Sequence, residues 1–249
     1  MKVYFIGAGP GDPELLTVKA RKIIKKADII IYAGSLLNKE ILKLARKDAQ
    51  LYDSAGMNLE EILSVIRKIK STDKIVARIH SGDPSIYGAI QEQMDWCQRQ
   101  KINYCLIPGI SSYQAVAATL RQELTLPGVS QTVILTRISG RTKVPAKEDL
   151  QKLAKSEATM VIFLSIHEIE RVVAKLKKSY GLNTPVIVIE KVSYPDEQRI
   201  VGTLQDIAKK VKAAGIKRQA VIIVGNVLRK NYQKSKLYDK NFEHAFRKK

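Results

Sequence analysis

The chain has 249 residues, and its 43 basic and 24 acidic side chains give a formal net charge of +19. That length supports a sizeable core in one or two domains, and no apolar run approaches the roughly 20 residues of a membrane-spanning helix. The N-terminal apolar run is too short for a signal peptide, so we expect a cytoplasmic protein without a membrane partner. Cys97 and Cys105 have no zinc or redox spacing, so we expect reduced thiols and no metal site.

The positive charge predicts an affinity for polyanions. Aromatic residues make up only 6% of the chain, the basic residues are spread along it, and no nucleic-acid-binding motif is present, so nucleic acid is not the expected partner. A substrate with several carboxylates would suit the charge equally well. A lysine-rich surface without a specific role is the remaining interpretation.

Short apolar runs alternate with helical patterns from the N-terminus onward. The expected strands are Val3–Ile6, Ile29–Tyr32, Ile75–Ile79, Tyr104–Ile107, Thr132–Leu135, Met160–Leu164, Val186–Glu190 and Ala220–Val224. The expected helices are Pro13–Lys26, Lys39–Arg46, Leu59–Ser71, Ile86–Arg99, Ser112–Leu120, Lys147–Lys155, Ile166–Lys178 and Leu204–Ala214. This alternation predicts an α/β fold with a largely parallel sheet.

A weak boundary falls at Thr119–Ser130, where the helical pattern stops and a Leu-Pro-Gly turn occurs. We therefore expect two α/β domains, residues 1–118 and 119–230, with a cofactor and substrate cleft between them. Residues 231–249 are polar and basic, and we expect a lightly packed tail.

The first strand runs into a glycine loop, Gly7-Ala8-Gly9-Pro10-Gly11-Asp12-Pro13. Asp12 suits a helix N-cap and Pro13 the first helical position. The loop is no dinucleotide fingerprint, because Asp12 stands where the third glycine would be needed. Taken alone, the loop could be only a tight turn.

Two further strands end in loops of the same kind. One is His80-Ser81-Gly82-Asp83-Pro84-Ser85-Ile86-Tyr87-Gly88, where Asp83 and Pro84 again suit a helix start. The other is Pro108-Gly109-Ile110-Ser111-Ser112. Because the carboxyl ends of parallel strands share one edge of a sheet, we expect all three loops to line a ligand site.

These three loops together resemble those of the tetrapyrrole (corrin/porphyrin) methylase family, and the resemblance extends over residues 3–228. It implies two α/β domains around a cleft, S-adenosyl-L-methionine as the methyl donor, S-adenosyl-L-homocysteine as the product, and a homodimer. Segments 32–36, 78–90, 136–142, 158–165 and 194–197 resemble the precorrin-4 C-11 methyltransferase branch. That branch implies cobalamin (B12) biosynthesis and an anionic tetrapyrrole substrate, precorrin-4 or its cobalt form.

The resemblance also implies roles for individual residues. The cofactor is expected against Pro10, Ser81, Gly82, Asp83, Ile86, Ser111, Ser112, Leu164, Ala220 and Ile222. The substrate is expected against Tyr32, Arg78, Arg137 and Arg141. Arginine can bind a carboxylate through two parallel hydrogen bonds, although a surface ion pair is as good an interpretation for each of the three.

Methyl transfer from a sulfonium to an electron-rich carbon needs mainly alignment, so we assign no catalytic base. Asp83 is a candidate by position, but helix capping is its preferred interpretation, and His80 is interpreted first as a packed residue at a strand end. The alternatives are a family member that acts at another ring carbon, a methylase of ribosomal RNA or of a translation factor, and a basic nucleic-acid-binding protein. A nucleic-acid-binding protein would be identified by an affinity for nucleic acid that falls steeply as the salt concentration rises.

Overall fold

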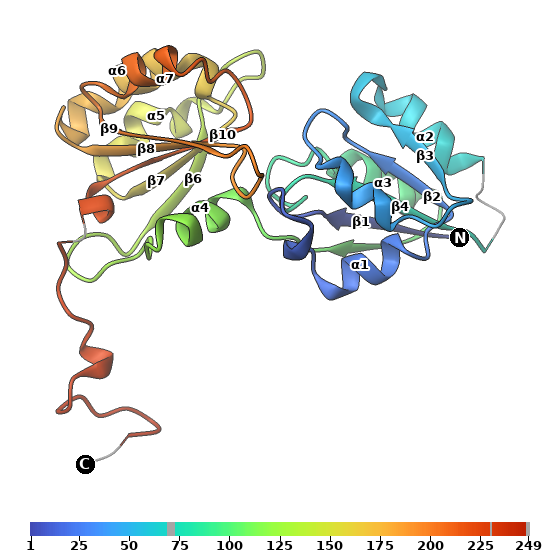
Figure 1. The fold of residues 1–249 in the computed structure, drawn as a ribbon, viewed down its shortest axis with the longest axis horizontal. Helices are drawn as coiled ribbons and strands as arrows, with labels where there is room; N and C mark the ends of the chain where they lie inside the picture. The colour runs from blue at the N-terminus through green and yellow to red at the C-terminus, as the bar shows by residue number, and fades with distance from the viewer. Residues whose placement is uncertain (69–72, 230, 248–249) are drawn as a thin grey trace. The chain divides into compact units, whose positions relative to one another are not determined.

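The computed structural model describes residues 1–68, 73–229 and 231–247 (Figure 1). The end of the expected helix Leu59–Ser71 and the last two residues of the tail lie outside these ranges. Contacts divide the chain into two compact units. Unit 1 comprises Met1–Val116 and Lys191–Glu197, and unit 2 comprises Ala117–Glu190 and Gln198–Lys249. The domain limits expected from the sequence stay a prediction.

Unit 1 contains a five-stranded sheet in the order β3-β2-β4-β1-β5, and all of its strand pairs are parallel. The strands are β1 (Lys2–Gly7), β2 (Ile29–Tyr32), β3 (Gln50–Asp53), β4 (Ile75–His80) and β5 (Asn103–Ile107). Four of them were predicted. β3 was missed because it is an edge strand with exposed side chains, so its sequence lacks an apolar signal.

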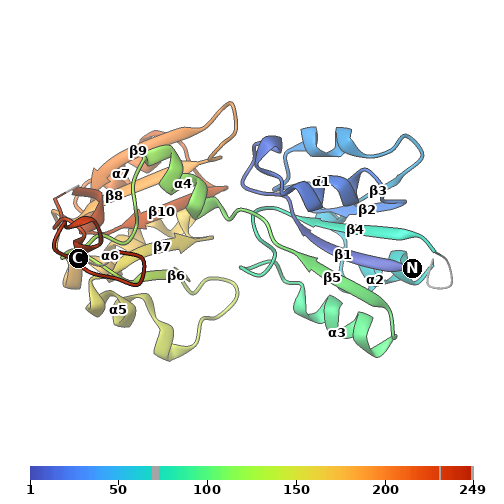
Figure 2. The ribbon, with the colours of Figure 1, turned by 90° about the horizontal axis from the view of Figure 1, so that it is seen from below.

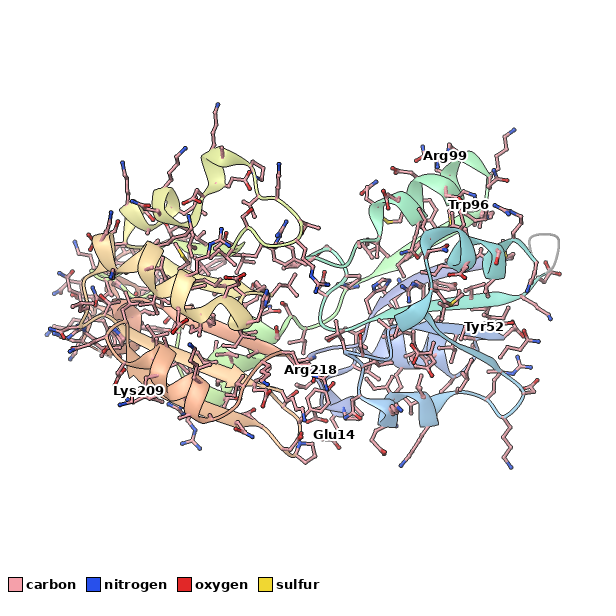
Figure 3. The ribbon with its side chains drawn as sticks, turned by 90° about the horizontal axis from the view of Figure 1, so that it is seen from above. Glu14, Tyr52, Trp96, Arg99, Lys209 and Arg218 are labelled. Carbon is pink, nitrogen blue, oxygen red and sulfur yellow. The ribbon has the colours of Figure 1, made fainter. Side chains whose placement is uncertain are left out.

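Helices cover both faces of this sheet, as Figure 2 shows. On one face, α1 (Val18–Ile24) buries Ala20 and Ile24 against the strands. On the other, α2 (Leu59–Arg67) and α3 (Gln91–Arg99) form a second core layer. Trp96 on α3 is buried there, whereas Arg99 on the same helix is exposed (Figure 3). Burial on both faces explains why β1 and β2 are largely apolar, whereas β4 also buries two polar residues, Arg78 and His80.

Unit 2 contains a second five-stranded sheet, in the order β6-β7-β10-β8-β9. Its strands are β6 (Val133–Arg137), β7 (Thr159–Phe163), β8 (Pro185–Glu190), β9 (Gln198–Thr203) and β10 (Ala220–Val224). Only β6 and β7 pair in parallel, and the other three pairs are antiparallel. The prediction of a largely parallel sheet is therefore wrong for this unit.

The connections explain this mixed sheet. The helix α6 (Ile169–Tyr180) joins β7 to β8, and α7 (Ile207–Ala213) joins β9 to β10. Each helix links two strands that run in the same direction, but β8 and β9 form an antiparallel hairpin that reverses the second pair. The two strand–helix–strand units interleave, so β10 lies between β7 and β8. A hairpin needs no crossover helix, and β9 was missed because it is an exposed edge strand.

Several expected helices are shorter than predicted. The segment Pro13–Lys26 is a 3-10 helix, Pro13–Leu15, followed by α1, whose N-cap is Thr17. α3 begins at Gln91 rather than Ile86. The expected helix Lys147–Lys155 contains only α5 (Leu150–Leu153) between two 3-10 turns. By contrast, α4 (Ser112–Leu120) has the predicted limits.

Helices α5, α6 and α7 supply most of the core of unit 2, together with one face of its sheet (Figure 1). The C-terminal residues 231–247 are mostly exposed, as expected for a lightly packed tail. Arg247 donates hydrogen bonds to the carbonyl groups of Leu237, Asp239 and Phe242, so much of the order of the tail is internal. Among the described residues, no helix is long and apolar enough to cross a membrane.

Candidate functional site

The three predicted loops meet at the carboxyl edge of the unit 1 sheet. The first two are joined by a pair of backbone hydrogen bonds: Gly9 N–H donates to Gly82 O at 3.2 Å, and Gly82 N–H donates to Gly9 O at 2.7 Å. Ala8 N–H also donates to His80 O at 2.8 Å. The first loop is therefore fixed to the second, which confirms that they share one edge.

The third loop packs against the other two through glycine. A Cβ atom on Gly7 would lie 2.5 Å from Gly109 N, and one on Gly109 would lie 2.3 Å from Gly82 O. These distances exclude any side chain at either position, because they lie well inside van der Waals contact. Gly7 and Gly109 thus allow three backbone segments to approach one another directly.

Asp83 ties the second loop to the third. Its Oδ2 accepts a hydrogen bond from Gly109 N–H at 2.9 Å, and its Oδ1 accepts one from Ser85 N–H at 2.8 Å. The prediction that Asp83 caps a helix is wrong, because the residues after it form a turn and α3 starts only at Gln91. Asp12, in contrast, caps the 3-10 helix that contains Glu14 (Figure 3), with Pro13 at its first position, as predicted.

The other cofactor residues expected in unit 1 lie in or beside these loops. Pro10 is buried between Gly9 and Gly11, and Ser81 and Ile86 are half-buried in the second loop. Ser111 is buried before α4, where Gln114 Oε1 accepts a hydrogen bond from its N–H, and Ser112 begins that helix. The structure therefore brings together all seven residues assigned to the cofactor in this unit. Their binding role stays a prediction.

His80 is buried at the end of β4, beside this edge. Its Nε2 atom has no hydrogen-bond partner among the described residues. Burial, with a smaller contribution from the nearby positive charge of Arg78, lowers the pKa of His80 to about 3. The imidazole is therefore neutral at neutral pH. Its burial agrees with the expected packed strand-end histidine.

Arg78 lies on the same face of β4, two residues earlier, and is only 5% exposed. Its guanidinium donates to Gln93 Oε1, Ser54 Oγ and the carbonyl of Ile31. Burial lowers the pKa of Arg78 to about 10. The surface ion pair considered for Arg78 is therefore wrong, and these contacts hold α3, β2 and β4 together. Its predicted contact with substrate stays a prediction.

The remaining residues predicted to bind substrate are Tyr32 in unit 1 and Arg137 and Arg141 in unit 2. Tyr32, at the end of β2, is half-buried in unit 1. In unit 2, Arg137 donates to the carbonyls of Ile138, Thr142 and Lys143, so it braces the loop after β6, whereas Arg141 in that loop is exposed. A surface ion pair is therefore wrong for Arg137 also.

The cofactor residues expected in unit 2 are of two kinds. Leu164, directly after β7, is 58% exposed and has φ of 52°, a conformation that costs a leucine energy. Ala220 and Ile222 lie in the hydrophobic core of unit 2, and Ile222 is fully buried. The cofactor roles of all three stay predictions.

Two residues missed as site residues contact the first loop from far along the chain. Ser193 Oγ accepts a hydrogen bond from Asp12 N–H at 3.0 Å, and the ring of Tyr194 packs on Gly11. The sequence analysis included segment 194–197 only in the family resemblance and predicted no site role for it. No spacing in the sequence predicts this contact, which depends on the hairpin between β8 and β9.

The loop edge offers backbone groups and small side chains to a ligand. A Cβ atom on Gly82 would meet its nearest heavy atoms at 3.8 and 3.9 Å, so there is room for an atom directly above this backbone. No group of three or more His, Cys, Asp or Glu side chains that could hold a metal occurs in the described part of the chain. The arrangement is suited to binding and orienting a polar ligand that has an apolar part.

Comparison with known proteins gives three kinds of match. The family model for Tetrapyrrole (Corrin/Porphyrin) Methylases matches residues 2–208. A cobalt-precorrin-4 C(11)-methyltransferase of Methanocaldococcus jannaschii is 55% identical over 249 residues, which cover 99% of this chain and 96% of the relative.

Solved structures agree with these matches. The X-ray structure of a cobalamin biosynthetic enzyme, cobalt precorrin-4 methyltransferase, matches with a TM-score of 0.89 at 40% identity, over 91% of this chain and 95% of the other. Uroporphyrin-III C-methyl transferase from Thermus thermophilus, complexed with S-adenyl homocysteine, matches with a TM-score of 0.77 at 26% identity, over 92% and 99%.

Proposed function

We propose that this chain, which belongs to the tetrapyrrole (corrin/porphyrin) methylase family, transfers a methyl group from S-adenosyl-L-methionine to C-11 of precorrin-4 or its cobalt form. It is a methyltransferase of cobalamin biosynthesis, since a relative with that activity in its name is 55% identical over nearly the full length of both chains. This relationship favours the precorrin-4 enzyme over family members that act at other carbons and over the nucleic-acid-binding class.

The observation that carries the proposed cofactor site is the meeting of three glycine loops at one edge of the unit 1 sheet. Gly9 and Gly82 are paired with each other through their backbone groups, and the open space above Gly82 accommodates a ligand against the main chain. The residues present therefore fit a nucleoside with an amino acid chain, which needs backbone hydrogen bonds and apolar contact. Pro10 and Ile86 supply apolar surface, and Ser81, Ser111 and Ser112 supply hydroxyl groups.

S-adenosyl-L-methionine, when bound, supplies an activated methyl group on a positively charged sulfur. The protein has to hold the acceptor carbon in line with it, and such alignment is worth up to about 7–11 kcal/mol. Asp83 contributes by fixing the second and third loops to each other. His80 is neutral at working pH, and its buried Nε2 atom has no partner among the described residues. We assign no general base.

The substrate is proposed to be an anionic tetrapyrrole, which agrees with the net charge of +19. Arg141 is the exposed arginine that we assign to a substrate carboxylate, and Tyr32 is assigned to the same ligand. We further propose that the protein is a homodimer in the cytoplasm. Sedimentation analysis of the purified protein tests the dimer.

The direct test incubates the purified chain with S-adenosyl-L-methionine and either precorrin-4 or cobalt-precorrin-4, followed by NMR location of the new methyl group. A methyl group on C-11 supports the proposal, and a comparison of rates decides between the two substrates. Methylation at another carbon would reassign the chain within the family. S-adenosyl-L-homocysteine should bind with a Kd of about 1 μM, corresponding to about −8 kcal/mol.

A further inference from the structure

The segment Lys191–Glu197 belongs to unit 1, although β8 and β9, which flank it in sequence, belong to unit 2. It makes three contacts with the cofactor side of unit 1. Ser193 Oγ accepts from Asp12 N–H at 3.0 Å, and Tyr194 Oη donates to the carbonyl of Leu36 at 3.2 Å. A Cβ atom on Gly11 would lie 2.2 Å from Tyr194 Cδ2, so the ring rests on the bare backbone of the first loop.

The segment has an internal framework that holds these two side chains in place. Lys191 forms an ion pair with Asp196, and Ser193 N–H donates to Glu197 Oε2 at 2.8 Å. Tyr194 N–H donates to the carbonyl of Lys191 at 3.0 Å. Lys191 and Ser193 have φ of 48° and 66°, a strained conformation that persists only where surrounding contacts fix it. The segment is therefore a defined turn and presents Ser193 and Tyr194 in fixed positions.

These contacts act on the loop that contains Pro10. On one side of Pro10, Gly9 is paired with Gly82. On the other side, the Tyr194 ring covers Gly11, whose carbonyl also accepts from Asn38 Nδ2 at 2.9 Å. Loss of the Tyr194 ring would remove the packing contact on this side of Pro10 and leave the Asn38 hydrogen bond.

We propose that Ser193 and Tyr194 are positioning residues for the cofactor, acting through Asp12 and Gly11 on the backbone around Pro10. This inference rests on the proposed function, because it assumes that the glycine loop binds S-adenosyl-L-methionine. Both side chains contact the loop itself. They should therefore govern cofactor affinity and leave the methyl-transfer step itself unchanged.

The first test compares Tyr194→Phe and Ser193→Ala with the wild type, using calorimetry with S-adenosyl-L-homocysteine and steady-state kinetics. Each variant loses one hydrogen bond, so the Kd and the KM for S-adenosyl-L-methionine should rise about two- to tenfold. The kcat at saturation and the KM for the tetrapyrrole should stay unchanged. Tyr180→Phe is the matched control, because it removes a tyrosine-to-carbonyl hydrogen bond, to Ala158, in unit 2. It should lower the melting temperature and leave the Kd unchanged.

A double-mutant cycle gives the sharper test. Gly11→Ala places a methyl group inside the Tyr194 ring, so it should weaken binding by about tenfold or more, and adding Tyr194→Ala removes that overlap. The two single effects should therefore not add, and the double variant should bind better than Gly11→Ala alone. If the effects add, the positioning role is wrong. It is also wrong if the wild type binds S-adenosyl-L-homocysteine and Tyr194→Phe and Ser193→Ala bind it with the same Kd. A wild type without affinity would overturn the proposed function instead.

Discussion

Asp83→Asn tests whether a single carboxylate holds the cofactor loops together. Asp83 uses both oxygens, one for Gly109 N–H at 2.9 Å and the other for Ser85 N–H at 2.8 Å. An amide has one oxygen, so one of these two donors loses its acceptor and faces an NH₂ group instead. Hydrogen bonds to a charged group contribute about 1.5–3 kcal/mol each. We expect the free energy of unfolding to fall by that amount.

The same substitution should weaken the cofactor complex, because the third loop is then released from the second. We expect the Kd for S-adenosyl-L-homocysteine to rise about tenfold or more, which corresponds to about 1.4 kcal/mol. Urea unfolding measures the first effect and calorimetry the second. A Kd within about twofold of the wild type would refute the argument that Asp83 holds the loops in their binding arrangement.

Asp206→Asn is the matched control for this experiment. Asp206 Oδ1 accepts from Thr203 N–H at 2.8 Å, and its other oxygen pairs with Lys210, all in unit 2. Because Lys210 lowers the pKa of this carboxyl, the group is fully charged at neutral pH. Its substitution should reduce stability in the same way without raising the Kd. An equal rise in Kd for both variants would show that general destabilisation, and not the loop contact, weakens binding.

Further predictions concern His80, the two arginines Arg137 and Arg141, and the tail. The pKa of His80 is about 3 in the folded state and about 6.5 in the unfolded state, so the unfolded state gains a proton first and stability falls as the pH drops below about 6.5. We expect a loss of about 2 kcal/mol in the free energy of unfolding at pH 5, and no such loss in His80→Gln. Urea unfolding at pH 5 and pH 8 measures both. In single-turnover experiments His80→Gln should slow methyl transfer only modestly, and a complete stop with both ligands bound would identify His80 as a base. Neutralising Arg141 should raise the tetrapyrrole KM, and an unchanged KM would show that Arg141 has no role in substrate binding. Arg137→Gln should instead lower the melting temperature, because the loop after β6 loses its hydrogen bonds to Arg137. Truncation after residue 230 should change the kcat and both KM values less than about twofold, because the tail is mostly exposed, and a larger loss would assign the tail a role in the site.

The sequence predicted the fold of unit 1 better than that of unit 2, and the reason lies in the strand connections. In unit 1 every strand pair is parallel, so apolar strands alternating with helices suffice to predict it. In unit 2, β8 and β10 are equally apolar, but β10 runs opposite to β8 because of the hairpin from β8 into β9, and β9 has little apolar signal of its own. The direction of a strand depends on the connection that precedes it, and the pattern of apolar residues does not reveal the hairpin between β8 and β9.

The candidate site divides in a similar way. The three loops were predicted because glycine, proline and aspartate are typical of turns and helix starts and can be recognised from the local sequence alone. Contacts across loops, such as Asp83 with Gly109, depend on tertiary structure and could not be predicted. Arg78 was assigned to substrate only because the family resemblance implies it. A period of two along β4 places Val76, Arg78 and His80 on one face, and this face is buried because α2 and α3 cover it, which the sequence of β4 alone does not show.

The loop glycines differ in how well they serve as steric probes of the cofactor site. Gly82 has φ of +65°, and a β-branched residue in this conformation strains the backbone by roughly 1–2 kcal/mol before any ligand is present. Gly82→Val would therefore not separate the loss of ligand space from strain within the loop itself. Gly11 does not have a positive φ, but a Cβ atom there would lie 2.2 Å from Tyr194 Cδ2, so Gly11→Ala reports on that packing contact rather than on ligand space.

The contact between Gly7 and Gly109 also has a consequence for folding. A two-residue slip of β5 along β1 would keep every side chain on its own face of the sheet, so the hydrophobic pattern alone does not exclude it. Such a slip would place a residue with a Cβ atom where Gly109 now touches Gly7, at a separation that no side chain tolerates. The glycine pair therefore acts as a register check: β1 and β5 can close against each other at their carboxyl ends in one alignment, the alignment that also assembles the three loops.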